Sequence, residues 1–217
     1  MVIEVKNVSK KFDGEDVLKG VSLTLEDGHI YGFVGPNGSG KSVFLKILCA
    51  FYEPSSGEVL FDGINVIKDN SFPKDTRALI EGPKFLPDAT GKENLMLLAS
   101  IQNKIGETEV DDILKKVGLY DDRNKVYHKY SVGMKQKLGI AQALMENPKI
   151  IILDEPLNGL DNKSAETIRN ILLGEKKNGK IIIIATHIKD DITNLCDIVY
   201  KVESGVITLA NNKDIKL

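Results

Sequence analysis

At 217 residues the chain is long enough for one domain with a substantial core, and its 42% hydrophobic content is ordinary for a globular protein. Its 29 basic and 31 acidic residues give a net charge of −2, which argues against a nucleic-acid partner. No apolar run approaches the roughly 18 residues that span a bilayer, and residues 1–11 lack the pattern of a secretory signal, so we expect a cytoplasmic protein.

The first strands along the chain are expected to form an antiparallel sheet. The segments 2–8, 17–25 and 58–61 have mixed or alternating polarity, which is typical of strands with one solvated face. An Asp-Gly pair, which favours a tight turn, follows each of them. We expect this sheet to pack over the core that carries the phosphate-binding motif.

That motif spans residues 35–42, which fit the pattern G-x-x-x-x-G-K-[ST] between a predicted strand at 29–34 and a predicted helix at 43–50. The glycines let backbone N–H groups point inward, and the helix adds its positive end, so the loop binds anions. Lys41 is expected to reach the β and γ phosphates of a nucleoside triphosphate, and Ser42 to ligate Mg²⁺. The motif alone leaves kinases, GTPases and ATPases open. The expected phosphate-binding residues are Gly35, Pro36, Asn37, Gly38, Ser39, Gly40, Lys41 and Ser42.

The middle of the chain reads as helical. Between about 90 and 148 the apolar residues follow helical periods, and no segment is a convincing strand. We therefore expect an inserted α-helical subdomain over about 84–148. Its predicted helices are 93–102, 109–117 and 133–145.

Two later segments predict a buried sheet. The runs 150–153 and 181–185 are continuously apolar and are separated by a helical stretch, as in strands buried on both faces of a parallel sheet. The tail 198–209 is expected to form two short strands about Ser204-Gly205. The fold class is therefore α/β: a P-loop NTPase core with a mostly parallel buried sheet, an antiparallel β subdomain and the inserted helical subdomain.

Candidate chemistry follows both buried runs. Asp154 and Glu155 stand at the carboxyl end of the first run, the edge at which open α/β sheets bind ligands. Asp154 is expected to hold Mg²⁺ opposite Ser42, and Glu155 to direct the water that attacks the γ-phosphorus. For both, an acidic turn without chemistry is the alternative. His187 ends the second run and is expected to donate a hydrogen bond to the γ-phosphate.

Two further groups are expected to be structural. Cys49 and Cys196 lie in apolar segments without metal-ligand spacing, so we expect reduced core residues. Lys176, Lys177 and Lys180 read as a solvated helix end, because basic side chains suit the negative pole of the preceding helix.

With these motifs in this order, the chain resembles the nucleotide-binding subunit of an ATP-binding cassette (ABC) transporter, from near its first residue to about residue 211. Residues 130–134 stand where the family has its signature, and 157–161 match its D-loop. His187 matches the family's switch histidine, and Phe12 falls where an aromatic ring stacks on adenine. The resemblance implies that ATP is the nucleotide.

The signature segment has a physical interpretation of its own. Ser131 is a natural N-cap for the helix that starts near Gly133, and such a helix end presents donors and positive potential. On these residues alone, an ordinary capped helix is the alternative. In ABC proteins the opposite protomer supplies this end to the γ-phosphate. The resemblance therefore implies two nucleotides between two ATP-binding subunits, in a homodimer or a heterodimer.

The signature departs from the family pattern at two positions. Val132 replaces the usual glycine and Met134 the usual glutamine, which puts a close backbone approach and one polar contact in doubt. The string 130–139 resembles the branch associated with export of, or self-protection against, bacitracin-type and lantibiotic-type peptides. It is a weak indication of the substrate.

A third departure concerns the contact with the membrane subunit. Aligned on Pro83, Glu81 stands at the position of the family's glutamine that touches Mg²⁺ and links to that subunit. A carboxylate ligates Mg²⁺ but adds negative charge beside a triphosphate. A solvated Glu81 is the alternative. Just beyond, Phe85, Leu86 and Pro87 are expected to present an apolar surface to a partner's cytoplasmic helix, unless the loop folds back and buries them.

Taken together, these motifs and the resemblance predict one ABC nucleotide-binding domain over 1–217. It is expected to be a Mg²⁺-dependent ATPase that dimerises on ATP and energises a separate integral membrane permease. Its expected location is cytoplasmic, peripheral at the inner face of the cell membrane. Two alternatives remain: a soluble ABC-type ATPase of DNA maintenance or translation, and a nucleotide-gated regulatory module. The expected roles are catalysis by Glu155, His187 and Lys41, metal binding by Ser42, Asp154 and Glu81, and nucleotide binding by Phe12, residues 35–42, Ser131 and Gly133.

Overall fold

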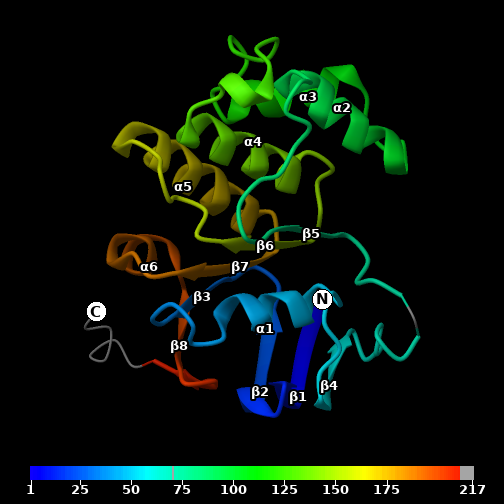
Figure 1. Ribbon diagram of the computed structural model, residues 1–217, viewed down its shortest axis with the longest axis vertical. Coiled ribbons are helices and arrows are strands. Elements are labelled where there is room, and N and C mark those ends of the chain that lie inside the picture. Colours follow the sequence, from blue (N-terminus) through cyan, green and yellow to red (C-terminus); the bar gives the residue numbers. More distant parts are fainter. Residues whose placement is uncertain (70, 211–217) are drawn as a thin grey trace.

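The computed structural model describes residues 1–69 and 71–210. A parallel sheet crosses the middle of the molecule, helices cover one of its faces, and a helix and a second sheet cover the other (Figure 1). The strands are β1 (Val2–Phe12), β2 (Glu15–Glu26), β3 (Ile30–Val34), β4 (Ser56–Phe61), β5 (Thr76–Leu79), β6 (Ile150–Asp154), β7 (Ile181–Thr186), β8 (Ile198–Glu203) and β9 (Val206–Leu209). The helices are α1 (Lys41–Leu48), α2 (Gly91–Gln102), α3 (Glu107–Lys116), the 3₁₀ turn η1 (Tyr127–Lys129), α4 (Val132–Leu144), α5 (Asn162–Lys177) and α6 (Lys189–Leu195).

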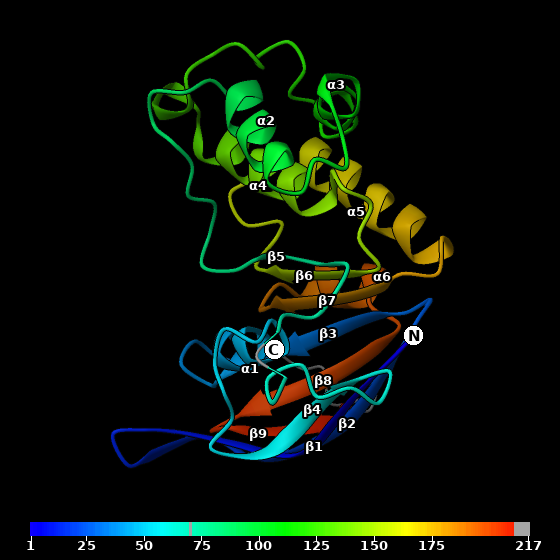
Figure 2. The same cartoon turned by 90° about the vertical axis from the view of Figure 1, so that its right-hand side faces the viewer.

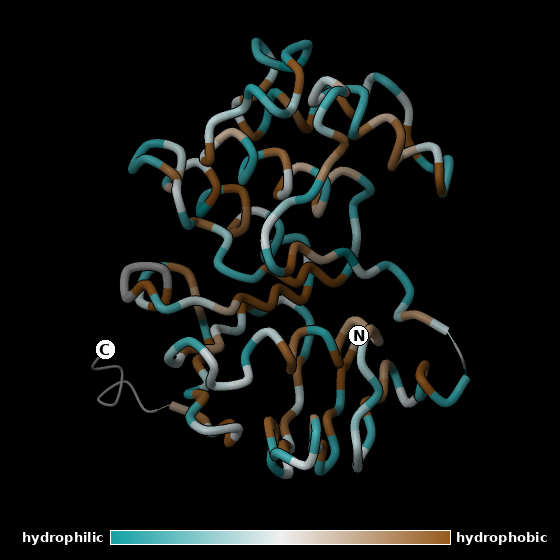
Figure 3. The backbone as a smooth tube through the Cα atoms, viewed as in Figure 1, coloured by the Kyte–Doolittle hydropathy of each residue, from teal (hydrophilic) through white to brown (hydrophobic). Residues whose placement is uncertain are grey.

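The parallel sheet confirms the predicted α/β core. Within the described residues its order is β5-β6-β7-β3-β8-β9, with β9 antiparallel at one edge (Figure 2). The isoleucines of β6 and β7 are fully buried and alternate between two clusters. Ile151 and Ile182 face the layer of α4 and α5, whereas Ile150 and Ile181 face α1 and the antiparallel sheet. Figure 3 shows this apolar band through the centre of the molecule.

The antiparallel sheet is also confirmed, in the order β2-β1-β4. Its first two strands run further than predicted, because the pairing of β1 with β2 continues through irregular registers to the turn at Asp13-Gly14. One face is buried against α1: Ile3, Val5 and Val59 share a cluster with the helix. The sheet therefore packs over the phosphate-loop core as expected.

The helices of the middle segment lie close to their predicted positions. Helix α2 begins at a capping box, in which the Thr90 hydroxyl accepts from the N–H of Glu93 and the Glu93 carboxylate accepts from the N–H of Thr90. Helices α2, α3 and α4 contribute to one apolar cluster that also contains the buried faces of α5 and β6. The boundaries of a separate subdomain at about 84–148 stay a prediction.

Two elements and one charged cluster differ from expectation. Strand β5 and helix α6 were not predicted; β5 is a half-buried edge strand whose side chains do not form an apolar run. The predicted solvated lysine cluster is wrong for Lys180, which is buried in an ion pair with Glu175, itself 2.6 Å from Lys116 Nζ. A buried ammonium group without a partner is unfavourable, and the ion pair with the carboxylate of Glu175 compensates the charge of Lys180.

The cysteines lie inside or near the core as expected. Cys49 is buried, and burial raises the pKa of its thiol to about 12, so the group stays protonated. Cys196 is half buried and its Sγ lies close to Gly32. Both residues serve packing.

Candidate nucleotide and metal site

The phosphate loop connects the end of β3 to the start of α1. Gly38 and Gly40 have positive φ angles of 78° and 108°, a conformation that glycine adopts without strain. A Cβ atom on Gly35 would overlap the carbonyl oxygen of Val202, so the loop also needs glycine for close packing against β8. These features explain why the loop needs glycine at these three positions.

The loop borders a cavity of about 350 Å³ at the carboxyl edge of the parallel sheet. The ammonium group of Lys41 donates to the carbonyl oxygens of Gly35, at 2.7 Å, and Pro36, at 3.0 Å. These two hydrogen bonds hold the ammonium group inside the loop, and phosphate oxygens can replace the carbonyl oxygens as acceptors. The cavity is lined by Val17, Asn37, Gly38, Gly40, Lys41, Ser42, Val43, Asp154 and Glu155.

The two residues predicted to hold the metal are in direct contact. The Ser42 hydroxyl donates to Oδ2 of Asp154 over 2.6 Å. Asp154 is buried, and desolvation raises the pKa of its carboxyl, while the Ser42 bond lowers that pKa and the charge of Glu155 raises it again. A hydroxyl beside a poorly solvated carboxylate fits a hard, oxygen-binding cation such as Mg²⁺.

Glu155 and His187 are brought together at the ends of neighbouring strands. Nδ1 of His187 lies 2.7 Å from Oε1 of Glu155. Among the described residues Oε2 of Glu155, which is buried, has no hydrogen-bond partner. Glu155 has a left-handed backbone with φ of 48°, and its N–H donates to the carbonyl of Ala185 on β7. One carboxylate oxygen is thus oriented by a ring and the other is free to accept a proton.

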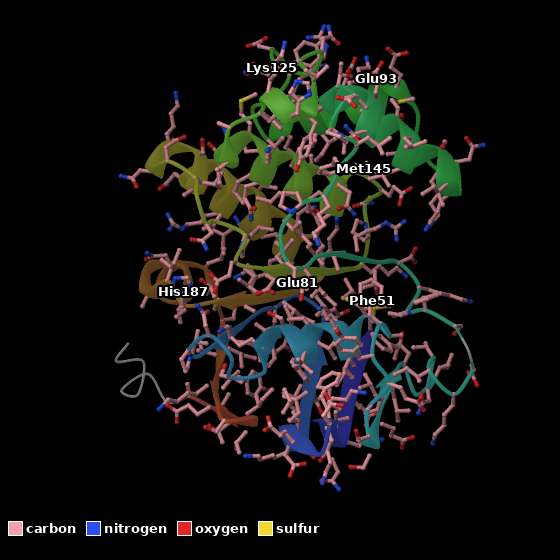
Figure 4. The ribbon with its side chains drawn as sticks, viewed as in Figure 1. Phe51, Glu81, Glu93, Lys125, Met145 and His187 are labelled. Atoms are coloured by element: carbon pink, nitrogen blue, oxygen red, sulfur yellow. The ribbon has the colours of Figure 1, made fainter. Side chains whose placement is uncertain are left out.

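The carboxylate of Glu81 points away from this pair. It forms an ion pair with Lys46 on α1, and this contact lowers the pKa of Glu81 and raises that of Lys46. The backbone amide of Glu81 lowers the pKa of Asp154, so the segment lies near the Ser42–Asp154 pair. Glu81 and His187 follow strands of the same sheet (Figure 4). A metal contact by the Glu81 side chain stays a prediction.

Phe12 stands half exposed at the end of β1. Its ring makes an edge contact with Tyr52 at 5.4 Å, and Lys10 Nζ lies 5.0 Å from its centre. An aromatic ring with such support is able to stack on a purine base.

The signature residues lie apart from the phosphate loop of the same chain. The Ser131 hydroxyl accepts from the N–H of Met134, which makes Ser131 the N-cap of α4. Helix α4 packs on the opposite face of the parallel sheet from α1 (Figure 1). Val132 is exposed and its side chain touches Gly159, so it does not crowd the N–H groups at the helix end.

Gln136, a buried polar residue of α4, is not among the residues predicted for the site. Its Nε2 donates to the carbonyl oxygens of Glu155 and Pro156, each at 3.0 Å. The signal was present in the sequence, since a glutamine on the apolar face of a helix needs buried partners for its amide.

Replacement of Asp154 by asparagine is expected to stabilise the nucleotide-free protein by about 1 kcal/mol. A carboxyl whose pKa is raised in the folded state destabilises the fold above that pKa, and asparagine removes the buried charge. The gain should be largest at neutral pH and shrink as the pH falls and Asp154 takes up its proton. Urea unfolding of both proteins at several pH values measures it; a variant less stable than the parent at neutral pH contradicts the raised pKa.

The family model described as ABC transporter matches residues 18–158. An uncharacterised ABC transporter ATP-binding protein of Bacillus subtilis (strain 168), YybJ, is 41% identical over 204 residues, 94% of each chain. The chain belongs to the ABC transporter family. The predicted recognition is thereby confirmed, and with it the predicted ATP-binding subunit and ATPase.

Two relatives of this ABC subunit are named as transport ATP-binding proteins, one for bacitracin and one for a lantibiotic. The bacitracin transport ATP-binding protein BcrA of Enterococcus faecalis is 36% identical, over 94% of this chain and 67% of its own length. The lantibiotic transport ATP-binding protein SrtF of Streptococcus pyogenes is 31% identical, over 98% and 92%. The resemblance to the bacitracin and lantibiotic branch is therefore confirmed.

Solved structures confirm the fold of the ABC subunit. The ATP-binding subunit of an ABC transporter superimposes with a TM-score of 0.88 at 25% identity, covering 100% of this chain and 92% of that one. A bacterial ABC transporter cassette solved as a dimer gives 0.85 at 26% identity, covering 94% and 96%. In the described part of the chain, no helix is both long and apolar enough to cross a bilayer.

Proposed function

We propose that this ABC subunit hydrolyses ATP with Mg²⁺ in the cavity between the phosphate loop and Glu155. The observation that carries the proposal is the pairing of Ser42 with Asp154, and of Glu155 with His187, at one sheet edge beside the loop. When bound, Mg²⁺ neutralises charge that develops on the phosphates. Ser42 and Asp154 are the residues that would hold it.

The other residues bind the nucleotide and move the proton. Lys41 exchanges its bonds to the loop carbonyls for the β and γ phosphates, and Phe12 stacks on the adenine. Oε2 of Glu155 accepts a proton from the attacking water, while Oε1 stays bonded to the His187 ring. The His187 side chain is exposed, and we assign it to the γ-phosphate.

A second ATP-binding subunit completes the site. The capped start of α4 presents N–H groups and positive potential, yet it lies on the other face of the sheet from its own loop. We therefore assign Ser131 and Gly133 to the γ-phosphate bound by the partner subunit. The dimeric cassette among the structural neighbours supports such an arrangement.

The permease is expected to contact the chain beside Glu81. Leu86, 53% exposed, and Pro87 form an apolar surface as expected, but Phe85 is half buried in edge contact with Tyr127. Phe51, 60% exposed, follows α1 and donates its N–H to the carbonyl of Lys46, the partner of Glu81; Figure 4 labels Phe51 and Glu81. A cytoplasmic helix of the permease would bury Phe51 and Leu86 and hold this subunit at the inner face of the membrane.

Leu86→Asp is expected to uncouple transport while ATP hydrolysis by the free subunit stays within about twofold of the parent, because the side chain is exposed and lies outside the nucleotide cavity. Reconstituted vesicles with the permease measure transport and hydrolysis together. The matched control is Ile64→Asp, a residue 56% exposed in the turn after β4. Equal transport by both variants contradicts the docking assignment.

The names of the relatives favour a peptide antibiotic as the transported substrate. Phosphate release from Mg-ATP by the purified chain tests the enzyme and separates it from a regulatory module. Co-purification with a multi-span membrane protein separates a transporter subunit from a soluble ATPase. A chain that binds ATP without releasing phosphate, alone or with its permease, contradicts the proposed function.

A further inference from the structure

Gln136 is a buried amide, 8% exposed, one turn into the helix that begins at the signature. Both of its Nε2 hydrogens are used, one on the carbonyl of Glu155 and one on the carbonyl of Pro156. Its neighbours on the buried face of α4, such as Leu138 and Ile140, are apolar. An apolar residue of the same size would pack at position 136 without a desolvation cost. The amide of Gln136 therefore points to a role for its two hydrogen bonds.

The peptide that it holds belongs to a residue in an unfavourable backbone conformation. Glu155 has φ of 48°, in the left-handed region that costs free energy for a side chain with a Cβ. Its N–H is fixed by the Ala185 carbonyl on β7, and its carbonyl by Gln136 and, at 3.2 Å, by the N–H of Asn158. Such a conformation persists only where the surroundings fix it from both sides.

The same helix also touches the far end of the segment after Glu155. The Val132 side chain packs on Gly159, and Gly133 lies against the Gly159 carbonyl. Helix α4 thus contacts the segment 155–159 at its far end through its first turn, and at its start through Gln136.

We propose that Gln136 is a positioning residue that fixes the backbone of Glu155 to α4 and so aims its carboxylate at the attacking water. The inference rests on the proposed role of Glu155. Gln136 does not line the nucleotide cavity; it acts by keeping Oε1 on His187 and the Glu155 side chain at the cavity wall. Without it, the peptide at 155–156 is free to relax toward ordinary backbone angles and the carboxylate turns away.

Gln136→Met tests the inference, since methionine keeps the length of the side chain and removes both donors. The expected result is a kcat lower by about 10- to 100-fold, as for a catalytic group displaced by about 1 Å, with the ATP dissociation constant within about twofold. Gln142→Met, at a half-buried position further along the same helix, is the matched control and should keep the parental kcat.

A double-mutant cycle separates positioning from general damage to the fold. In a Glu155→Gln background the Gln136→Met change is expected to reduce the residual turnover no further, because the base that it positions is already absent. Equal fold losses in both backgrounds, or a parental kcat in the single variant, overturn the inference. Parent and Gln142→Met proteins that fail to hydrolyse ATP would instead contradict the proposed function.

Discussion

Glu155→Gln is expected to lower the turnover of ATP by about 10³-fold, within the range lost when a general base is removed. Glutamine keeps the shape of the side chain and an oxygen for the His187 ring, but it cannot take the proton that Oε2 accepts. Binding should survive, because Lys41, Ser42 and Asp154 are unchanged. ATP that binds without being hydrolysed should hold two subunits together, so the variant is expected to elute as a dimer in Mg-ATP.

Phosphate release, nucleotide binding and size-exclusion chromatography of the same preparation measure the three expectations. His187→Ala is the companion variant, since it removes the ring that orients Oε1 and leaves the carboxylate in place. It should lose less activity than Glu155→Gln if the ring serves orientation and phosphate contact only. A Glu155→Gln protein that hydrolyses ATP at the parental rate would remove Glu155 from its role.

The second large effect is expected at the start of α4. Ser131→Arg places a long side chain over the N–H groups that we assign to the partner's γ-phosphate, so turnover should fall by about 10²- to 10³-fold, as on loss of a transition-state donor. Ser131 is exposed, and the helix α4 that it caps packs on the other face of the sheet from α1, which follows the phosphate loop. The affinity of the single subunit for ATP is therefore expected to stay within about twofold.

Mixed dimers make this prediction specific to the partner. A chain with Ser131→Arg and a chain with Lys41→Ala are each inactive alone, yet together they assemble one site with an intact loop and an intact helix end. We expect the mixture to recover part of the parental rate and each separate variant to stay inactive. A mixture as inactive as its components would show that the helix end does not act across the interface.

Much of this structure could be predicted because some sequence patterns have one physical solution. The isoleucine runs of β6 and β7 fit strands buried on both faces, and the loop at 35–42 fits an anion site between a strand and a helix. The same patterns put Asp154, Glu155 and His187 at one sheet edge, which the structure shows through two short contacts.

The features that could not be predicted depend on contacts with residues that are distant along the chain. Strand β5 forms because β6 lies beside it, and its own residues carry little strand preference. Lys180 is buried because Glu175 compensates it, and the Glu81 side chain points to Lys46 on another element. The role of Gln136 could not be predicted, because it depends on a hydrogen bond to the backbone of Glu155, and the residues beside Gln136 in the sequence do not indicate this contact.

In the proposed dimer, the phosphate loop of one subunit holds the triphosphate, and the capped start of α4 from the other subunit covers it. A crystal structure of the Glu155→Gln protein with Mg-ATP tests it most directly. We expect a dimer in which Ser131 and Gly133 of the partner subunit lie at hydrogen-bond distance from the γ-phosphate beside Lys41 and Ser42. An ATP-bound dimer whose α4 ends are far from every γ-phosphate would contradict the account.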